Sequence, residues 1–189
     1  MRPMTSTAAV LFAVAATHAG AQTRDAMGRS STTARKIASA RAAAPAGISR
    51  NATVMEMGKD GKMVTLHEGS NGWVCIPDDP ATPGPDPMCM DKTWQDWLTA
   101  YTAKQAPSPS QVGIAYMLAG GADPSNADPF ATKPAAGQHW VITGAHLMLI
   151  LPDARSFEDY PTDPASGGAF VMWKGTPYAH VMVPVARGH

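Results

Sequence analysis

The stretch Gly69–Leu98 constrains the fold more than any other part of the chain, because it holds both cysteines and three of the five tryptophans. A short β-prone run over 73–76 ends at Pro77, and from there to Pro87 the chain contains five prolines and one glycine. Proline fixes φ and removes an amide donor, so neither a helix nor a sheet can continue through this segment. The composition predicts a strand followed by a stiff, exposed loop.

A helix is predicted directly after this loop. Asp91 occupies the position of an N-cap residue. Four apolar side chains then follow at the spacing of one helix face, namely Trp94, Trp97, Leu98 and Tyr101. We expect this face to pack on the core of the protein.

The N-terminus has the pattern of a secretory signal peptide. Arg2 precedes an apolar run over 8–16, and small residues at 19–21 fit a signal-peptidase site. The apolar run is too short to cross a bilayer, and no later run is longer, so no membrane span is expected. The chain is therefore predicted to be periplasmic or secreted.

The domain organisation follows from this pattern. We predict a signal peptide over 1–21, a flexible segment over 22–33 and a single α+β domain over 34–189. The whole chain contains 17 glycines, 17 prolines and 16% charged residues, so the domain is expected to be rich in loops.

Export favours a disulfide between Cys75 and Cys89, since an oxidising compartment promotes pairing. The alternative is a metal or redox role for the two cysteines. A zinc site would need histidine or carboxylate partners that no short spacing near them supplies. The disulfide is the preferred interpretation.

The segment 22–50 is basic, with six Lys and Arg residues against Asp25 alone. It could contact an acidic surface. No aromatic residues are interleaved with its charges, as nucleic-acid or membrane binding would favour, so a solvated helix face is the simpler interpretation. We expect no nucleic-acid partner.

The first elements of the domain are expected to be a helix and a hairpin. Residues 34–44 form a helix that stops at Pro45 and, with Ile37 as its only large apolar residue, should lie on the surface. Asp60-Gly61 then predicts a tight turn between two strands, 53–57 and 63–68. This turn pairs Met57 with Val64 and Met55 with Leu66 on one apolar face, and it leaves Val54 and a partly exposed His67 on the other.

The second half of the chain alternates short strands with long loops. The loop 122–138 carries oxygen donors at Asp123, Ser125, Asn126 and Asp128, but their spacing does not match a calcium loop and is better explained by turn formation. The strand 145–151 is apolar on both faces, as a covered central strand would be. Further strands are predicted over 112–118, 139–143, 169–174 and 178–183; Val112, Ile114, Tyr116 and Leu118 would share one face of the first of these.

These elements predict the α+β class, with a largely antiparallel or mixed sheet of about six to eight strands. The amphipathic helix after Asp91 would pack on one face of the sheet. Long loops rich in proline and glycine would lie at its edges.

The familiar catalytic and cofactor signatures are absent from the sequence. It contains no nucleophile elbow, no zinc-protease helix motif, no Cys-x-x-Cys, no Walker loop and no dinucleotide-binding glycine motif. This absence favours a non-enzymatic binding or accessory module of the periplasm, with a small ligand or a periplasmic protein as its partner.

One pattern points to chemistry. His146-x-Met148 and His180-x-Met182 lie on two predicted strands, and the strand period places each histidine beside its methionine on one face. If the strands are neighbours and their faces are aligned, imidazoles and thioethers come together in a set that suits copper as Cu(I). The alternative is that these residues simply fill the core. Further thioethers are available at Met55, Met57, Met88, Met90, Met117 and Met172.

An enzymatic interpretation uses the same two histidines. His146 and His180 would act as acid and base groups in a small hydrolase-like enzyme. The orienting carboxylate would come from Asp123, Asp128, Asp153 or Glu158.

Three segments carry a resemblance to other proteins: Ser-Asn-Gly-Trp-Val-Cys-Ile-Pro-Asp over 70–78, Ser-Asn-Ala-Asp-Pro-Phe-Ala-Thr-Lys-Pro over 125–134, and Trp-Lys-Gly-Thr-Pro-Tyr-Ala-His-Val-Met over 173–182. Through them the chain resembles a family of small exported bacterial proteins without an assigned activity. The resemblance implies export. It implies no fold, substrate or site residue.

Overall fold

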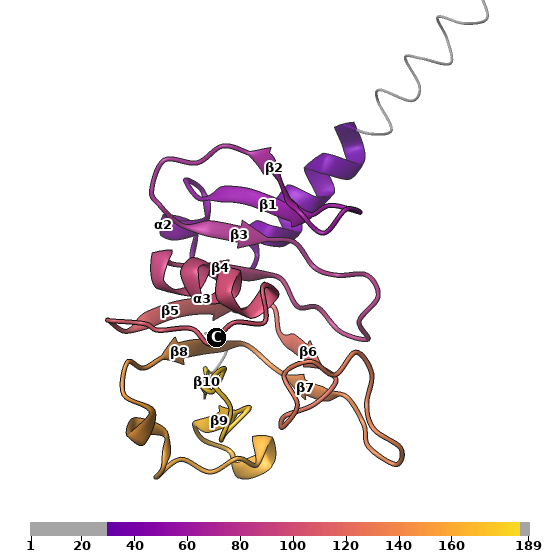
Figure 1. Cartoon of the computed structure of the whole chain (residues 1–189). Coiled ribbons are helices and arrows are strands. Elements are labelled where there is room, and N and C mark those ends of the chain that lie inside the picture. The colour runs from indigo at the N-terminus through magenta and orange to yellow at the C-terminus, as the bar shows by residue number, and fades with distance from the viewer. Residues whose placement is uncertain (1–29, 186–189) are drawn as a thin grey trace, which may run out of the picture. The chain divides into compact units, whose positions relative to one another are not determined.

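The computed structural model describes residues 30–185 (Figure 1). The chain divides into two units, Met1–Ala34 and Arg35–His189, and every strand described here belongs to the second. The predicted signal peptide over 1–21 lies outside the described residues, as does most of the predicted flexible segment. Both stay predictions.

Within the described residues, eight strands form one sheet in the order β2-β1-β3-β4-β5-β8-β10-β9. Their bounds are β1 Thr53–Met57, β2 Met63–His67, β3 Val74–Ile76, β4 Met88–Met90, β5 Gly113–Met117, β8 His146–Ile150, β9 Phe170–Met172 and β10 His180–Pro184. β1 and β3 are parallel, and the other neighbouring pairs are antiparallel. A separate pair joins β6 (Gly121–Asp123) to β7 (Val141–Thr143). The predicted α+β class is confirmed.

The helices lie before and between the strands. Residues 30–41 are helical, and α2 (Ala46–Ser49) and α3 (Lys92–Thr102) follow, with two 3-10 turns, η1 (Ala154–Phe157) and η2 (Pro164–Ser166). No helix in the described part of the chain is long and apolar enough to span a membrane.

Helix α3 begins where the sequence predicts. The side chain of Asp91 accepts a hydrogen bond from the backbone N–H of Trp94 (2.9 Å), and its second oxygen accepts one from Ile114 of β5 (2.7 Å). The cap therefore also ties the helix to the sheet. Trp94 and Trp97 are buried, and α3 lies across β4 and β5 (Figure 1).

Apolar side chains cover both faces of the sheet. Under α3 the largest cluster includes Met90, Trp94, Trp97, Met148, Phe170, Met172 and Met182. A second cluster surrounds Cys75 and Cys89, and a third joins Phe157, Val171 and Val181. Alternate residues of β8 face different clusters, so this strand is covered on both sides, as its apolar sequence predicts.

The helix over 34–44 departs from its prediction in length and in position. It ends at residue 41, and a short helix that was not predicted, α2, begins directly after Pro45. Ala40 and Ala43 are buried in the cluster around the disulfide, and Cys89 Sγ lies 3.6 Å from the carbonyl oxygen of Ala40. The prediction of a surface helix was wrong for this end, because small alanine side chains let the backbone approach the sheet closely.

The β1–β2 hairpin forms, but its predicted register was wrong. Met57 pairs with Met63 and Met55 with Thr65, and a bulge follows between Val54 and Met55. The turn is longer than two residues, since the N–H of Gly58 bonds the carbonyl of Lys62 at 2.7 Å. Val54 is fully buried in the cluster around the disulfide and Met57 is 51% exposed, the reverse of the predicted faces, because the face with Val54 packs on that cluster.

Two further differences come from packing between distant segments. β4 occupies residues 88–90, between the predicted loop and α3, where no strand was predicted, and it pairs with both β3 and β5. The face of β5 under α3 carries Gly113, Ala115 and Met117, whereas Val112 is 49% exposed. A Cβ atom at Gly113 would lie 3.2 Å from Cδ1 of Trp94, so only a small residue fits beneath the helix.

Candidate functional site

Cys75 and Cys89 form a disulfide, as predicted, between directly opposed residues of β3 and β4. Both are fully buried in the second cluster, which makes the bond structural. A structural disulfide suggests an oxidising, extracytoplasmic environment.

The two His-x-Met segments lie on β8 and β10, which are adjacent and antiparallel. Met148 is directly opposite Met182, and His146 is opposite Pro184. Opposed residues share a face, and residues two apart share it too, so all four predicted side chains lie on the face under α3. The strands are therefore neighbours with aligned faces, but the predicted four-residue copper site also requires the two histidines to come together, and they do not.

The two histidines stand at opposite ends of this group. His180 comes four residues before Pro184, so the Cα positions of His146 and His180 differ by about 13 Å along the strands. Met148 and Met182 lie between them. The two imidazoles consequently have different neighbouring residues.

Each histidine also faces a methionine across the sheet. Met117 of β5 is opposite His146, and Met172 of β9 is opposite His180. We call the set Met117, Met148, Met172, Met182, His146 and His180 the methionine face. The sequence shows that these thioethers exist but could not assign their partners, because register is a property of the folded sheet.

Both imidazoles are held in the same way. His146 Nδ1 lies 2.7 Å from the carbonyl oxygen of Gly144, and His180 Nδ1 lies 3.0 Å from that of Tyr178. A carbonyl can only accept, so Nδ1 carries the proton in each ring and Nε2 keeps its lone pair. Burial lowers both pKa values, that of His180 to about 4, so both rings are neutral at pH 7.

The Nε2 atom of His146 is buried and has no hydrogen-bond partner among the described residues. The ring is 1% exposed, and its Cε1 lies close to Gly121, where a Cβ would be 2.9 Å away. Burying an unpaired acceptor costs about 1–3 kcal/mol. His146 therefore carries a penalty that ordinary core packing does not explain.

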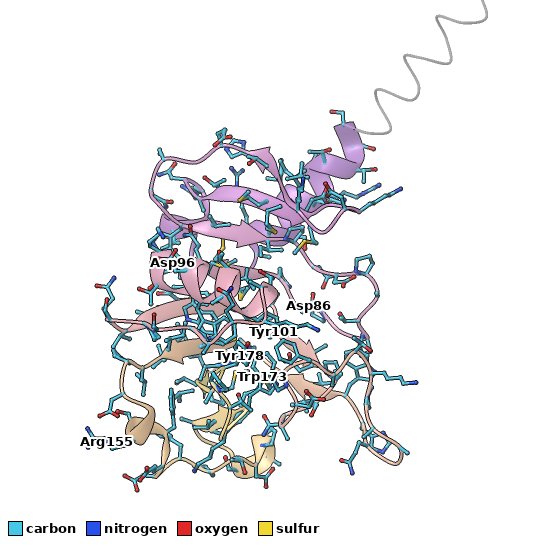
Figure 2. All side chains as sticks on the ribbon, in the orientation of Figure 1. Asp86, Asp96, Tyr101, Arg155, Trp173 and Tyr178 are labelled. Atoms are coloured by element: carbon cyan, nitrogen blue, oxygen red, sulfur yellow. A yellow bond between two sulfur atoms is a disulfide. The ribbon has the colours of Figure 1, made fainter. Side chains whose placement is uncertain are left out.

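Aromatic rings surround His180. The ring centroids of Trp94, Trp97 and Trp173 lie 5.3, 5.8 and 5.0 Å from the imidazole, each nearly perpendicular to it. The planes of Trp97, Tyr101 and Trp173 are almost parallel to one another. Figure 2 shows Tyr101, Trp173 and Tyr178 gathered beside α3.

These rings hold the loop 122–138 in place. Tyr101 donates a hydrogen bond to the carbonyl of Pro129, and Trp173 Nε1 donates one to the carbonyl of Ser125 (2.9 Å). Within the loop, Ser125 Oγ accepts from the backbone N–H groups of Ala127 and Asp128. Turn formation is confirmed for Ser125 and for Asp128, which accepts from the N–H of Phe130 (2.9 Å), whereas Asp123 lies in β6.

A cavity of about 190 Å³ lies between α3 and the sheet. We call it the α3 cavity. Its lining consists of Asp86, Met88, Trp94, Trp97, Leu98, Tyr101, Met117, Ala122, Asp123, Met148, Met172, Trp173 and His180. Two of the predicted site residues, His180 and Met148, line this cavity, whereas His146 and Met182 are buried outside its lining.

Two carboxylates interrupt the apolar wall. Asp86 is anchored by the proline-rich loop, because it accepts hydrogen bonds from the N–H of Asp79 (2.8 Å) and the hydroxyl of Thr82 (2.9 Å). Asp123 receives no hydrogen bond from any residue that the structure describes. Burial, and then the charge of Asp86, raise the pKa of Asp123 to about 6.

The geometry gives less support to the acid–base interpretation. In both histidines the ring nitrogen that an orienting carboxylate would bond is taken by a backbone carbonyl. Asp153, one of the predicted partners, is paired with Arg155 at the surface (Figure 2). Sequence reasoning considered Asp123 as an orienting carboxylate or an oxygen donor and missed Asp86. Only the tertiary structure brings the proline-rich loop and β6 to one cavity.

Within the described residues, no three His, Cys, Asp or Glu side chains are grouped as a metal site. Any metal bound at the methionine face would therefore depend on thioether sulfur. No protein-family model matches the chain, and comparisons with curated proteins and with solved structures found no significant match.

Proposed function

We propose that the protein is a non-enzymatic binding module that holds a small positively charged ligand in the α3 cavity. The observation that carries the proposal is Asp123, a carboxylate that, with Asp86, interrupts a mostly apolar cavity wall and receives no hydrogen bond from the described residues. An apolar pocket with a few convergent polar groups is the usual form of a small-molecule site.

The charges of the cavity favour a cation. Asp86 and Asp123 both line it, and none of the described lining residues is Lys or Arg. The charge of Asp86 disfavours ionisation of Asp123, so a bound positive charge between them would stabilise the ionised pair. The indole and phenol rings of the wall add a second attraction for a cation.

An extracytoplasmic location belongs to the same proposal. The buried disulfide suggests an oxidising compartment, and the resemblance to small exported bacterial proteins and the N-terminal signal pattern support export. In that setting the module would capture its ligand in the periplasm or outside the cell.

Ligand binding can be tested by tryptophan fluorescence and thermal unfolding, because three tryptophans line the cavity. Two probes of the same charge are suitable, benzyltrimethylammonium and Cu(I) supplied under reducing conditions. We expect at least one of them to quench fluorescence and to raise Tm. Asp123→Asn should weaken binding by about tenfold or more, as loss of one close charge pair does.

Asp96→Asn is the matched control. Like Asp123→Asn, it removes one negative charge. Asp96 lies on α3 (Figure 2), where its side chain is 66% exposed and does not line the cavity. The affinity of the Asp96→Asn variant for each probe should equal that of the wild type. The proposal fails if neither probe binds, or if Asp96→Asn weakens binding as much as Asp123→Asn.

A further inference from the structure

We infer that the ligand of the α3 cavity is Cu(I), bound by Nε2 of His180 and by the thioether sulfurs of Met148 and Met172. The inference rests on the proposed function, since it names the cation. It keeps His180 and Met148 of the four predicted metal residues and adds Met172 in place of His146 and Met182, because the sheet register and the cavity lining select different neighbours.

The burial and the hydrogen bond of His180 suit its imidazole to bind a metal ion. The side chain is 2% exposed and lines the cavity, and its Nδ1–H is held by the carbonyl of Tyr178 at 3.0 Å. This hydrogen bond leaves Nε2 as the free donor atom, and no described residue bonds it. Histidines that bind metals are usually oriented in this way, with the second ring nitrogen donating to a carbonyl or carboxylate.

The two thioethers approach from either side of His180. Met172 is directly opposite it on β9, and Met148 is opposite Met182, two residues along β10 from His180. Direct partners have Cβ atoms about 4.5–5.5 Å apart and diagonal ones about 7–8 Å, which the flexible methionine side chain can span. Both methionines line the same cavity as the imidazole.

The donor set selects the metal. Thioether sulfur is a soft ligand that favours Cu(I), whereas calcium and magnesium require oxygen and zinc is usually bound by thiolate, imidazole or carboxylate. Two thioethers and one neutral imidazole add no charge, so the ion keeps its single positive charge. Asp86 and Asp123 in the cavity wall offset that charge without acting as ligands, and the indoles around His180 shield the ion from water.

The test is Cu(I) binding by the full chain without oxygen, measured by competition with a chromophoric Cu(I) chelator. The wild type should bind one Cu(I). Met148→Leu and Met172→Leu should each weaken binding by about tenfold or more, because a thioether ligand is lost while the volume is nearly kept. His180→Ala should abolish binding.

Met182→Leu is the matched control. Met182 belongs to the same face and is buried like Met172, but it does not line the cavity. Its variant should bind Cu(I) as the wild type does. The leucine variants also keep the test decisive if His180→Ala fails to fold, and X-ray absorption of the loaded protein should show two sulfur ligands and one nitrogen ligand.

The possible results separate this inference from the function on which it rests. If benzyltrimethylammonium binds through Asp123 but Cu(I) does not bind, the copper inference is overturned and the binding function stands. If neither binds, both fail. If Cu(I) binds but Met182→Leu weakens it as much as Met172→Leu does, the ligand assignment is wrong.

Discussion

Met148 on β8 lies directly opposite Met182 on β10, with His146 and His180 at the two ends of the same face. Sequence spacing pairs Met148 with His146 and Met182 with His180. The register instead brings His180 to Met172 and His146 to Met117, and the α3 cavity takes Met148 rather than Met182. The two strands therefore contribute different residue types to the proposed copper site, Met148 from β8 and His180 from β10, although their His-x-Met patterns are identical.

The disulfide should contribute substantially to stability. It closes a loop with a sequence separation of 14, for which the chain-entropy model gives about 3 kcal/mol. We expect the double variant Cys75→Ala/Cys89→Ala to lose about 2–3 kcal/mol of unfolding free energy in urea, slightly less than the model value because the prolines already stiffen the unfolded loop.

Thiol counting provides an independent check on the same bond. Protein exported to an oxidising compartment, then denatured without reductant, should show no free thiol. Two reactive thiols in that material would contradict the disulfide.

Trp97 should be the main anchor of α3. It is 5% exposed and contacts the rings of Trp94, Tyr101, Tyr178 and His180. Trp97→Ala should reduce the unfolding free energy by about 3–5 kcal/mol, as truncation of a buried aromatic does. Chemical denaturation at pH 7 measures this change.

The control on the exposed side of the helix is Asp96→Ala. Asp96 is paired with Lys92, and such an exposed pair contributes about 0.3–0.5 kcal/mol. Gln95 is a poorer control, because its amide donates a hydrogen bond to the carbonyl of Gly72 at 2.8 Å. Equal losses for Trp97→Ala and Asp96→Ala would show that α3 is not packed as described.

Asp123 should destabilise the unliganded protein at neutral pH. Its pKa rises from an ordinary 3.8 to about 6 in the fold, so the unfolded chain loses the proton first as pH rises. Stability contributed by this residue is therefore present below pH 3.8 and is lost as pH rises through 6. Asp123→Asn should be more stable than the wild type by up to about 3 kcal/mol at pH 7.5, and equal to it near pH 3.5.

The measurement is the difference between the two pH–stability curves in the absence of ligand. The lowered pKa of His180 acts in the opposite direction, since stability from a buried neutral histidine is lost as pH falls below 6.5. This contribution is present in both proteins and cancels in the difference. A constant difference across the range would mean that the pKa of Asp123 is not raised.

Local patterns in the sequence predicted the elements whose determinants lie within one segment. Asp91 and the spacing from Trp94 to Tyr101 define α3, because capping and the apolar period act over a few residues. The runs that become β1, β8 and β10 are recognisable in the same way, and the cysteine pair follows from composition and the export signal.

The tertiary structure alone decided which residues meet. β4 has no strand signal of its own and exists because β3 and β5 satisfy its backbone on both sides. Gly113 and Ala115 face α3, since the helix lies too close to β5 for larger side chains. The α3 cavity likewise combines Asp86, Asp123, Met172 and His180 from distant segments, and their proximity depends on strand order and register, which local spacing does not encode.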